Sequence, residues 1–179
     1  MLELTPAATR FILHWGEMGS RWGVNRTVAQ IHALLYISPR PLNAEEISET
    51  LSVARSNVST SLRELQAWGI VNTVHTLGDR KDYYESIHDV WQLFRAIVAQ
   101  RFQREIEPTL RVLGECVAEA QSEGKTVEDK DTFDRLNELY EFFSTLDSWR
   151  GQLLEMSPRE MKRASKIGGK VAKLLRSGS

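Results

Sequence analysis

The sequence predicts a mainly α-helical fold with one two-stranded β-hairpin near its middle. Three observations support this prediction. Apolar residues recur at helical spacing along most of the 179 residues. Two short β-rich runs, 70–76 and 83–87, flank a polar turn. An apolar stripe then continues from Trp91 to Ala120 with a mean spacing of 3.6 residues, which indicates one face of a long helix.

The first two helices follow from their end signals. Thr5 can cap a helix that has Pro6 at its first position, and a break is expected near Gly23. A second helix starts at Asn25 and should end before Pro39, because the residue preceding a proline is disfavoured in the α conformation. Residues 38–42 are predicted to form a turn.

Two shorter helices come next. Asn43 can cap the third helix, which has two acidic residues in its first turn, where the helix dipole favours negative charge. The fourth helix is expected over 54–68, with Gly69 as the left-handed residue that ends it. Residues 77–82 form the polar turn between the two β-rich runs.

The rest of the chain is predicted to be helical. Pro108 lies inside the long stripe and should kink or break that helix, because proline removes a backbone donor. Another helix is expected over about 130–150. Ser157 and Pro158 begin a last helix, and residues 157–179 carry seven Lys or Arg and one Glu.

The composition argues against several functional classes. The net charge of −1 points to no particular partner, and Cys116 has no second cysteine. The four histidines are dispersed and no phosphate loop or nucleophile elbow is present, so we expect no metal, no cofactor and no enzyme. Neither a leader peptide nor a membrane-spanning stretch is recognisable, which predicts a cytoplasmic protein without membrane insertion.

Short helices followed by a β-hairpin form the layout of a winged helix-turn-helix. Residues 47–65 and 69–71 resemble the helix-turn-helix of the MarR class of bacterial transcription regulators. The GbsR-like branch of that class is similar over the region of Phe11, Gly16 and Gly23, over 36–38 and over 78–84. The resemblance covers roughly residues 5–120. Ser52 and Ala54 depart from the glycine and serine usual in such turns, which leaves open a helix start shifted by one turn, with Ser52 or Ser56 as substitute cap.

The polar face of the fourth helix is the candidate DNA-binding surface. An α-helix fits the major groove, where Arg can bind guanine and Asn can bind adenine through two hydrogen bonds. The candidate base readers are Arg55, Asn57, Thr60 and Arg63; Ser56 and Ser59 suit phosphate oxygens, and Arg80 and Lys81 would reach the flanking backbone or the minor groove. The alternative is that this face is only the solvated side of an amphipathic helix.

The long helices raise the question of a partner. A winged-helix domain of about 80 residues cannot cover the whole apolar stripe from Trp91 to Ala120. We expect residues 1–88 to form the DNA-binding domain and residues 89–179 a helical dimerisation region with a basic C-terminal helix. The resemblance implies a two-fold homodimer that binds a pseudo-palindrome, with recognition helices about 34–36 Å apart. The alternative is that 90–123 and 130–150 fold on each other as a hairpin. The basic tail could contact DNA, anionic lipid or the acidic helix of its own or the partner chain.

A small-molecule effector is a further possibility. The GbsR-like branch includes regulators that respond to choline-type compounds, and aromatic side chains bind quaternary ammonium groups by cation–π attraction. Trp15, Trp22 and Trp91 are therefore candidate ligand-binding residues, although core packing is the alternative for each.

Together these features predict a homodimeric regulator, of repressor type, that binds double-stranded DNA through helix 54–68 and the wing at 77–82. The alternative is a winged-helix protein-interaction module. Salt dependence separates the two, because phosphate contacts make log K fall by about 0.9 per log unit of salt for each neutralised phosphate.

Overall fold

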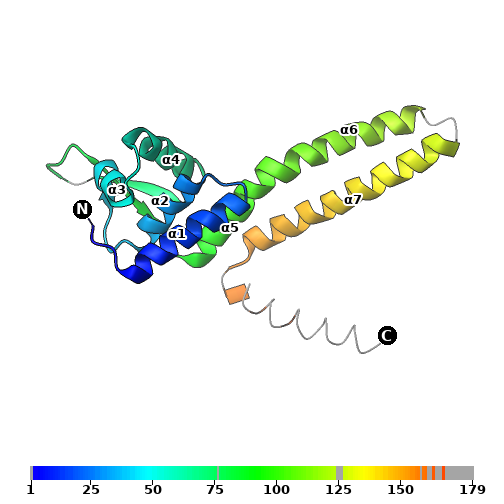
Figure 1. The fold of residues 1–179 in the computed structure, drawn as a ribbon. Helices are drawn as coiled ribbons and strands as arrows, with labels where there is room; N and C mark the ends of the chain where they lie inside the picture. The colour runs from blue at the N-terminus through cyan, green and yellow to red at the C-terminus, as the bar shows by residue number, and fades with distance from the viewer. Residues whose placement is uncertain are drawn as a thin grey trace. The chain divides into compact units, whose positions relative to one another are not determined.

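The computed structural model describes residues 2–75, 77–123, 127–157, 159, 160, 163 and 167. The chain forms two units, Met1–Ala96 and Ile97–Ser179. The boundary between them falls within the helix that begins at Val90 (Figure 1). The predicted division of roles between residues 1–88 and 89–179 stays a prediction. Since the position of one unit relative to the other is not determined, each is described by itself.

Helices α1 (Pro6–Arg21) and α2 (Arg26–Ile37) start at the predicted caps. The Thr5 hydroxyl accepts a hydrogen bond from the Ala8 amide at 3.2 Å, and the Asn25 side chain accepts one from the Thr27 amide at 2.8 Å. The two helices cross closely at Gly19, where an added Cβ would lie 2.5 Å from the Cβ of Ala29. The glycine that weakens the helical signal in the sequence therefore permits close helix packing.

Helices α3 (Ala44–Leu51) and α4 (Arg55–Ala67) form the helix-turn-helix. Ser52 ends α3 in the left-handed conformation, with φ 52°, where such motifs often have glycine. Ala54 occupies the cap position of α4 and provides no side-chain hydrogen bond, yet the helix begins at Arg55. The shift of the helix start considered above does not occur, and neither Ser52 nor Ser56 replaces the missing cap.

The hairpin strands β2 (Val71–His75) and β3 (Asp82–Ser86) form at the predicted positions. A third strand, β1 (Leu42–Asn43), pairs antiparallel with β3, so the sheet order is β1-β3-β2. The prediction of a simple turn over 38–42 was therefore incomplete. A strand of two residues has no alternating pattern long enough to be recognised in a sequence.

A continuous apolar core joins these elements. Its fully buried side chains come from α2, α3, α4 and the start of the sheet, and they are Ile31, Leu34, Leu35, Leu42, Ile47, Val58, Leu62, Leu65 and Ile70. Val58, Leu62 and Leu65 lie on one side of α4, which confirms the predicted spacing. The opposite side of α4 is consequently turned outwards.

The remaining helices are α5 (Val90–Arg101), α6 (Glu107–Glu123) and α7 (Val127–Glu155). A π-helical segment, Phe102–Ile106, joins α5 to α6 just before Pro108, where a kink or break was predicted. Helices α6 and α7 lie side by side in the second unit (Figure 1), and Gly114 approaches the ring of Tyr140. This confirms the hairpin alternative for these helices, which does not exclude a dimer.

The last predicted helix is described mainly at its start. Ser157 and Glu160 form the expected capping box, with the Ser157 amide donating to Glu160 at 2.6 Å. Beyond it, Arg163 and Ile167 are described as helical and exposed, and the remaining residues of the basic helix lie outside the described ranges. Among the helices of the described residues, none has the length and apolar character needed to cross a membrane.

Candidate nucleic-acid interface

The outer face of α4 gathers the predicted DNA-contacting residues of this helix. Every one of them is exposed: Arg55, Ser56, Asn57, Ser59, Thr60 and Arg63. The opposite face is buried through Val58, Leu62 and Leu65, so the core fixes which side of the helix faces solvent. No acidic residue occurs in the sequence between Arg55 and Arg63.

Arg63 is held loosely along this face. Its Nε donates to the Ser59 carbonyl at 3.3 Å, and its terminal nitrogen donates to the Thr60 hydroxyl at 3.3 Å. Both contacts are long for N–H···O hydrogen bonds, so a base or phosphate can replace them at low cost. Within the described residues, Arg55 and Asn57 form neither an ion pair nor a side-chain hydrogen bond, which leaves their polar groups available.

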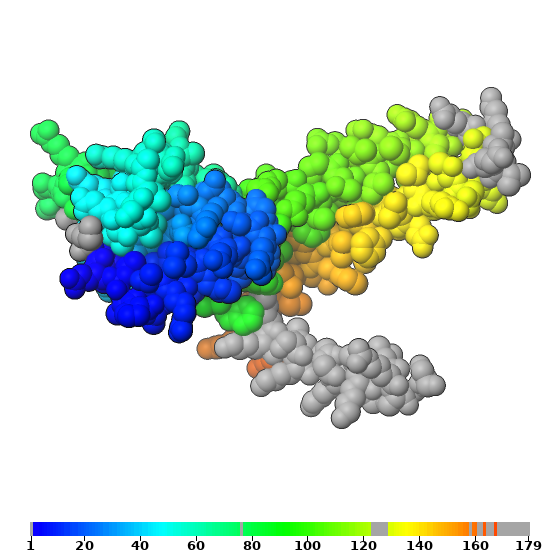
Figure 2. All heavy atoms as spheres, viewed as in Figure 1, coloured from blue at the N-terminus to red at the C-terminus, as the bar shows by residue number. Residues whose placement is uncertain are grey.

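The wing, residues 77–82, projects from the first unit as a narrow protrusion, drawn in green in Figure 2. Asp79 braces its turn by accepting hydrogen bonds from the Lys81 amide at 2.9 Å and the Tyr83 hydroxyl at 2.8 Å. These bonds hold the pKa of the Asp79 carboxyl below its usual value. Arg80 and Lys81 are both exposed on the wing, as predicted.

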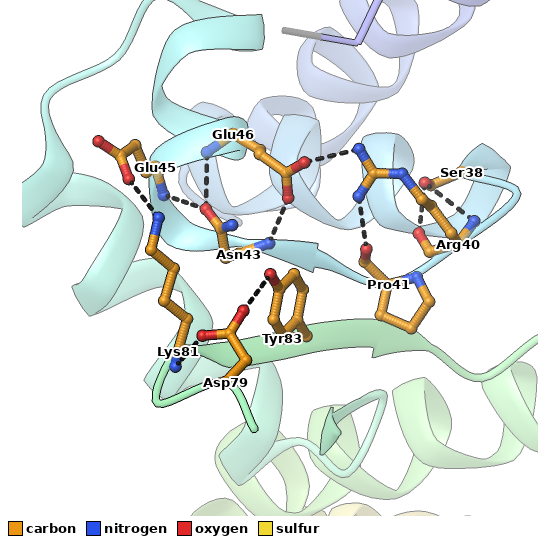
Figure 3. A network of polar contacts seen from close by, with 9 residues as sticks. All are labelled: Ser38, Arg40, Pro41, Asn43, Glu45, Glu46, Asp79, Lys81 and Tyr83. Carbon is orange, nitrogen blue, oxygen red and sulfur yellow. Dashed lines mark hydrogen bonds and ion pairs between the residues drawn. The ribbon is translucent and has the colours of Figure 1, made fainter. Parts of the chain in front are cut away.

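Lys81 is not free, because its ammonium group donates to Glu45 at 3.0 Å (Figure 3). The contact joins the wing to the first turn of α3. A hydrogen bond and the positive charge of Lys81, followed by the charge of Arg55, lower the pKa of the Glu45 carboxyl. Glu45 was not predicted to be part of this surface, since no sequence spacing relates two residues that are 36 positions apart.

The start of α3 is itself tightly fixed. Asn43 and Glu46 form a reciprocal capping box, and Glu46 also pairs with Arg40 at 2.6 Å (Figure 3). The hydrogen bond from Arg40 is the main reason that the pKa of the Glu46 carboxyl is lowered. Helix α3 therefore presents Glu45 to the wing from a rigid backbone.

Comparison with known proteins identifies this arrangement. Residues 22–82, which contain α2, the helix-turn-helix and the wing, match the model of the MarR family. These residues are therefore similar to a MarR-family winged helix-turn-helix. This confirms the resemblance seen in the sequence.

The curated relatives of this chain are distant. It is 26% identical over 144 residues to the HTH-type transcriptional repressor OpcR of Bacillus subtilis, covering 78% of this chain and 77% of OpcR. It is 24% identical over 127 residues to the repressor GbsR of the same organism, covering 71% of this chain and 69% of GbsR. The crystal structure of a transcriptional regulator is 19% identical, with a TM-score of 0.56, and the match covers 83% of this chain and 96% of that one. This last similarity shows the fold alone.

The three candidate ligand-binding tryptophans lie in different surroundings. Trp15 is half-buried and packs against Phe11 and His32, with ring centroids 5.3 and 6.3 Å away. The ring centroid of Trp91 lies 6.5 Å from that of Phe94. The side chain of Trp22, in contrast, is 54% exposed. An open depression of about 620 Å³ beside α1 is lined by none of the three. Their role in ligand binding stays a prediction.

A buried histidine lies at the centre of the first unit. His32 is 4% exposed, packs between the rings of Trp15 and Tyr36, and places its Nε2 3.3 Å from the Ser86 hydroxyl. Burial lowers the pKa of the His32 ring from 6.5 to about 4, because the charged form loses its hydration. The ring is therefore neutral at physiological pH.

Other chemical groups are sparse in the described ranges. His, Cys, Asp and Glu side chains form no group of three there that could hold a metal ion. Cys116 is a half-buried free thiol.

Proposed function

We propose that this chain is a MarR-family transcription regulator that binds double-stranded DNA as a homodimer, with α4 in the major groove and the wing on the flanking backbone. The observation that carries the proposal is the two-sided character of α4. Its apolar side is anchored in the core, while two arginines and an asparagine stand exposed on the other side, with no acidic residue between positions 55 and 63 of the sequence. That arrangement presents hydrogen-bond donors in an orientation fixed by the fold.

The residues of this face have different roles. Arg55, Asn57, Thr60 and Arg63 read base edges, because their long or branched polar groups can reach into the groove. Ser56 and Ser59 are shorter and donate to phosphate oxygens. Arg80 and Lys81 supply positive charge to the backbone or the minor groove beside the recognition helix.

The experiment that tests the proposal compares three variants. Arg63→Ala and Asn57→Ala should each reduce the preference for a selected operator over random duplex by about 5- to 150-fold, which corresponds to about 1–3 kcal/mol. Lys81→Ala should weaken binding to both duplexes equally and lower the salt slope by up to about one. Affinity would be measured by fluorescence anisotropy over a salt series.

Equal behaviour of the three variants would contradict these roles. A weak salt dependence of the unmodified protein would favour the protein-interaction module instead. The operator itself would come from selection of bound duplexes out of a random pool.

A homodimer is supported by apolar side chains on the second unit. Leu139, Phe142 and Trp149 of α7 are 48%, 56% and 62% exposed, and their spacing places them on one side of the helix. Val112 of α6 is 54% exposed. Such a group of large apolar residues is typical of an association surface.

Trp149→Glu should shift the dimer towards monomer. Loss of a tryptophan that is a hot spot of an interface costs about 2 kcal/mol or more, so we expect the dimer dissociation constant to rise by at least about 30-fold. Sedimentation equilibrium would measure the change. Ser148→Glu is the control, because Ser148 is also exposed but lies about 100° around the helix from Trp149. Equal dissociation constants for the two variants would contradict this surface.

We further propose that the chain is a cytoplasmic repressor of the GbsR-like branch and not an enzyme. The support is that OpcR and GbsR are both transcriptional repressors. Control by a small molecule, of the choline type, belongs to the same proposal and rests on Trp15, Trp22 and Trp91 as candidates. Repeating the duplex selection with and without choline tests it, since an effector of a repressor should alter the bound fraction.

A further inference from the structure

The carboxylate of Glu45 stands at a fixed position beside the proposed DNA-binding surface. The backbone amide of Glu45 donates to the Asn43 side chain at 3.0 Å, within the capping box that begins α3. The Glu46 carboxylate closes that box by accepting from the Asn43 amide at 2.9 Å. The capping box therefore holds the backbone from which the Glu45 side chain reaches the wing (Figure 3).

Two of the proposed DNA-contacting cations interact electrostatically with this one carboxylate. The Lys81 ammonium lies 3.0 Å from it, on a wing turn that Asp79 braces from within. Arg55, at the start of the recognition helix, is close enough for its charge to lower the pKa of Glu45 further. Glu45 is thus the counter-charge of a cation from the wing and interacts with a cation from α4.

We propose that Glu45 is an internal substitute for a DNA phosphate, which occupies Lys81 in the free protein and thereby sets the affinity and the salt dependence of DNA binding. This inference rests on the proposed function and adds to it a residue that does not itself contact DNA. Glu45 opposes binding in two ways: Lys81 must leave it before reaching a phosphate, and its own negative charge then remains near the DNA backbone.

The exposure of the ion pair makes this exchange feasible. The side chains of Lys81 and Glu45 are 56% and 50% exposed, so water already screens their attraction. Exposed pairs of this kind contribute little to stability, and a phosphate can compete with the carboxylate for the ammonium group. We therefore expect the ion pair to lower the affinity for DNA without preventing binding.

The salt dependence should carry a signature of the pair. A lysine that neutralises a phosphate releases condensed cations from DNA, which adds about 0.9 to the slope of log K against log salt. When Lys81 leaves Glu45, the freed carboxylate attracts a cation from solution and offsets part of that release. In the unmodified protein Lys81 should therefore contribute less than one full phosphate contact to the slope.

The test is a double-mutant cycle on the full chain, with Glu45→Gln, Lys81→Ala and the double variant. Glu45→Gln keeps the shape of the side chain and should bind operator and random duplexes about two- to fivefold more tightly, with an unchanged ratio between them. Its salt slope should be steeper by up to about one. In the Lys81→Ala background the same substitution should have less than about half of this effect.

Glu49→Gln is the matched control, because it removes the same charge one turn further along α3, whereas the carboxylate that accepts from Lys81 is that of Glu45. We expect less than about a twofold change for it. Melting curves of every variant establish that it is folded, and Glu45→Ala provides a second variant that should change affinity in the same direction.

The outcomes separate this inference from the function on which it rests. If the unmodified protein binds duplex DNA with a steep salt dependence and Glu45→Gln binds no more tightly, the inference is overturned and the proposed function stands. An undiminished effect in the Lys81→Ala background, or an equal effect of Glu49→Gln, also overturns it. If the unmodified protein shows no salt-dependent binding to duplex DNA, the proposed function itself fails.

Discussion

Leu62→Ala is expected to lower the free energy of unfolding by about 2–5 kcal/mol, because it removes a side chain that is 1% exposed and leaves a cavity between α4 and the core. The loss should also reduce DNA binding, since the recognition helix depends on this contact for its position. Denaturant unfolding, followed by circular dichroism, measures the change.

The neighbouring Arg63 provides the matched control. Arg63→Ala removes an exposed side chain one position further along α4, so its effect on the free energy of unfolding should stay within about 0.5 kcal/mol. Its effect on operator preference should nevertheless be large. A stability loss at Arg63 equal to that at Leu62 would contradict the division of α4 into an anchoring side and a reading side.

Acidification is expected to destabilise the first unit through His32. The folded state keeps the ring neutral down to a pKa of about 4, whereas the unfolded chain takes up a proton below about 6.5. Since the pKa is lowered on folding, the contribution of His32 to the free energy of unfolding is complete above pH 6.5 and is lost as the pH falls towards 4. The pKa difference corresponds to about 3 kcal/mol.

Urea unfolding at a series of pH values tests this expectation. His32→Phe should remove the part of the pH dependence between about 6.5 and 4, while His14→Gln, at an exposed position, should leave it unchanged. Comparison of variants is needed because carboxylates titrate in the same range. An unaltered pH profile for His32→Phe would show that the ring is not the responsible group.

Most of the helices could be predicted from the sequence because their signals are local. Thr5, Asn25 and Asn43 mark helix starts by a side chain that bonds within three residues, and the structure contains each of these bonds. The buried side of α4 followed from a spacing of three and four residues, because one face of a helix repeats in that way. The exposed site residues on α4 followed from the same spacing.

What the sequence did not reveal depends on contacts between distant segments. Strand β1 exists because Leu42 and Asn43 meet Tyr84 and Tyr83 of β3, a pairing that no local pattern encodes. The ion pair of Glu45 with Lys81 has the same origin, since it needs the wing to lie against α3. The start of α4 at Arg55 without a side-chain cap shows that tertiary packing can outweigh a missing local signal.

The crossing of α1 and α2 has a consequence for how this chain tolerates sequence change. At Gly19 the two helices can approach this closely only because the residue has no Cβ. The facing Cβ of Ala29 is fixed to its backbone and cannot rotate away from an added atom. A position without any side chain is therefore as restrictive as a buried leucine. In a survey of random variants it should be among the least permissive sites, although it contributes nothing to the apolar area of the core.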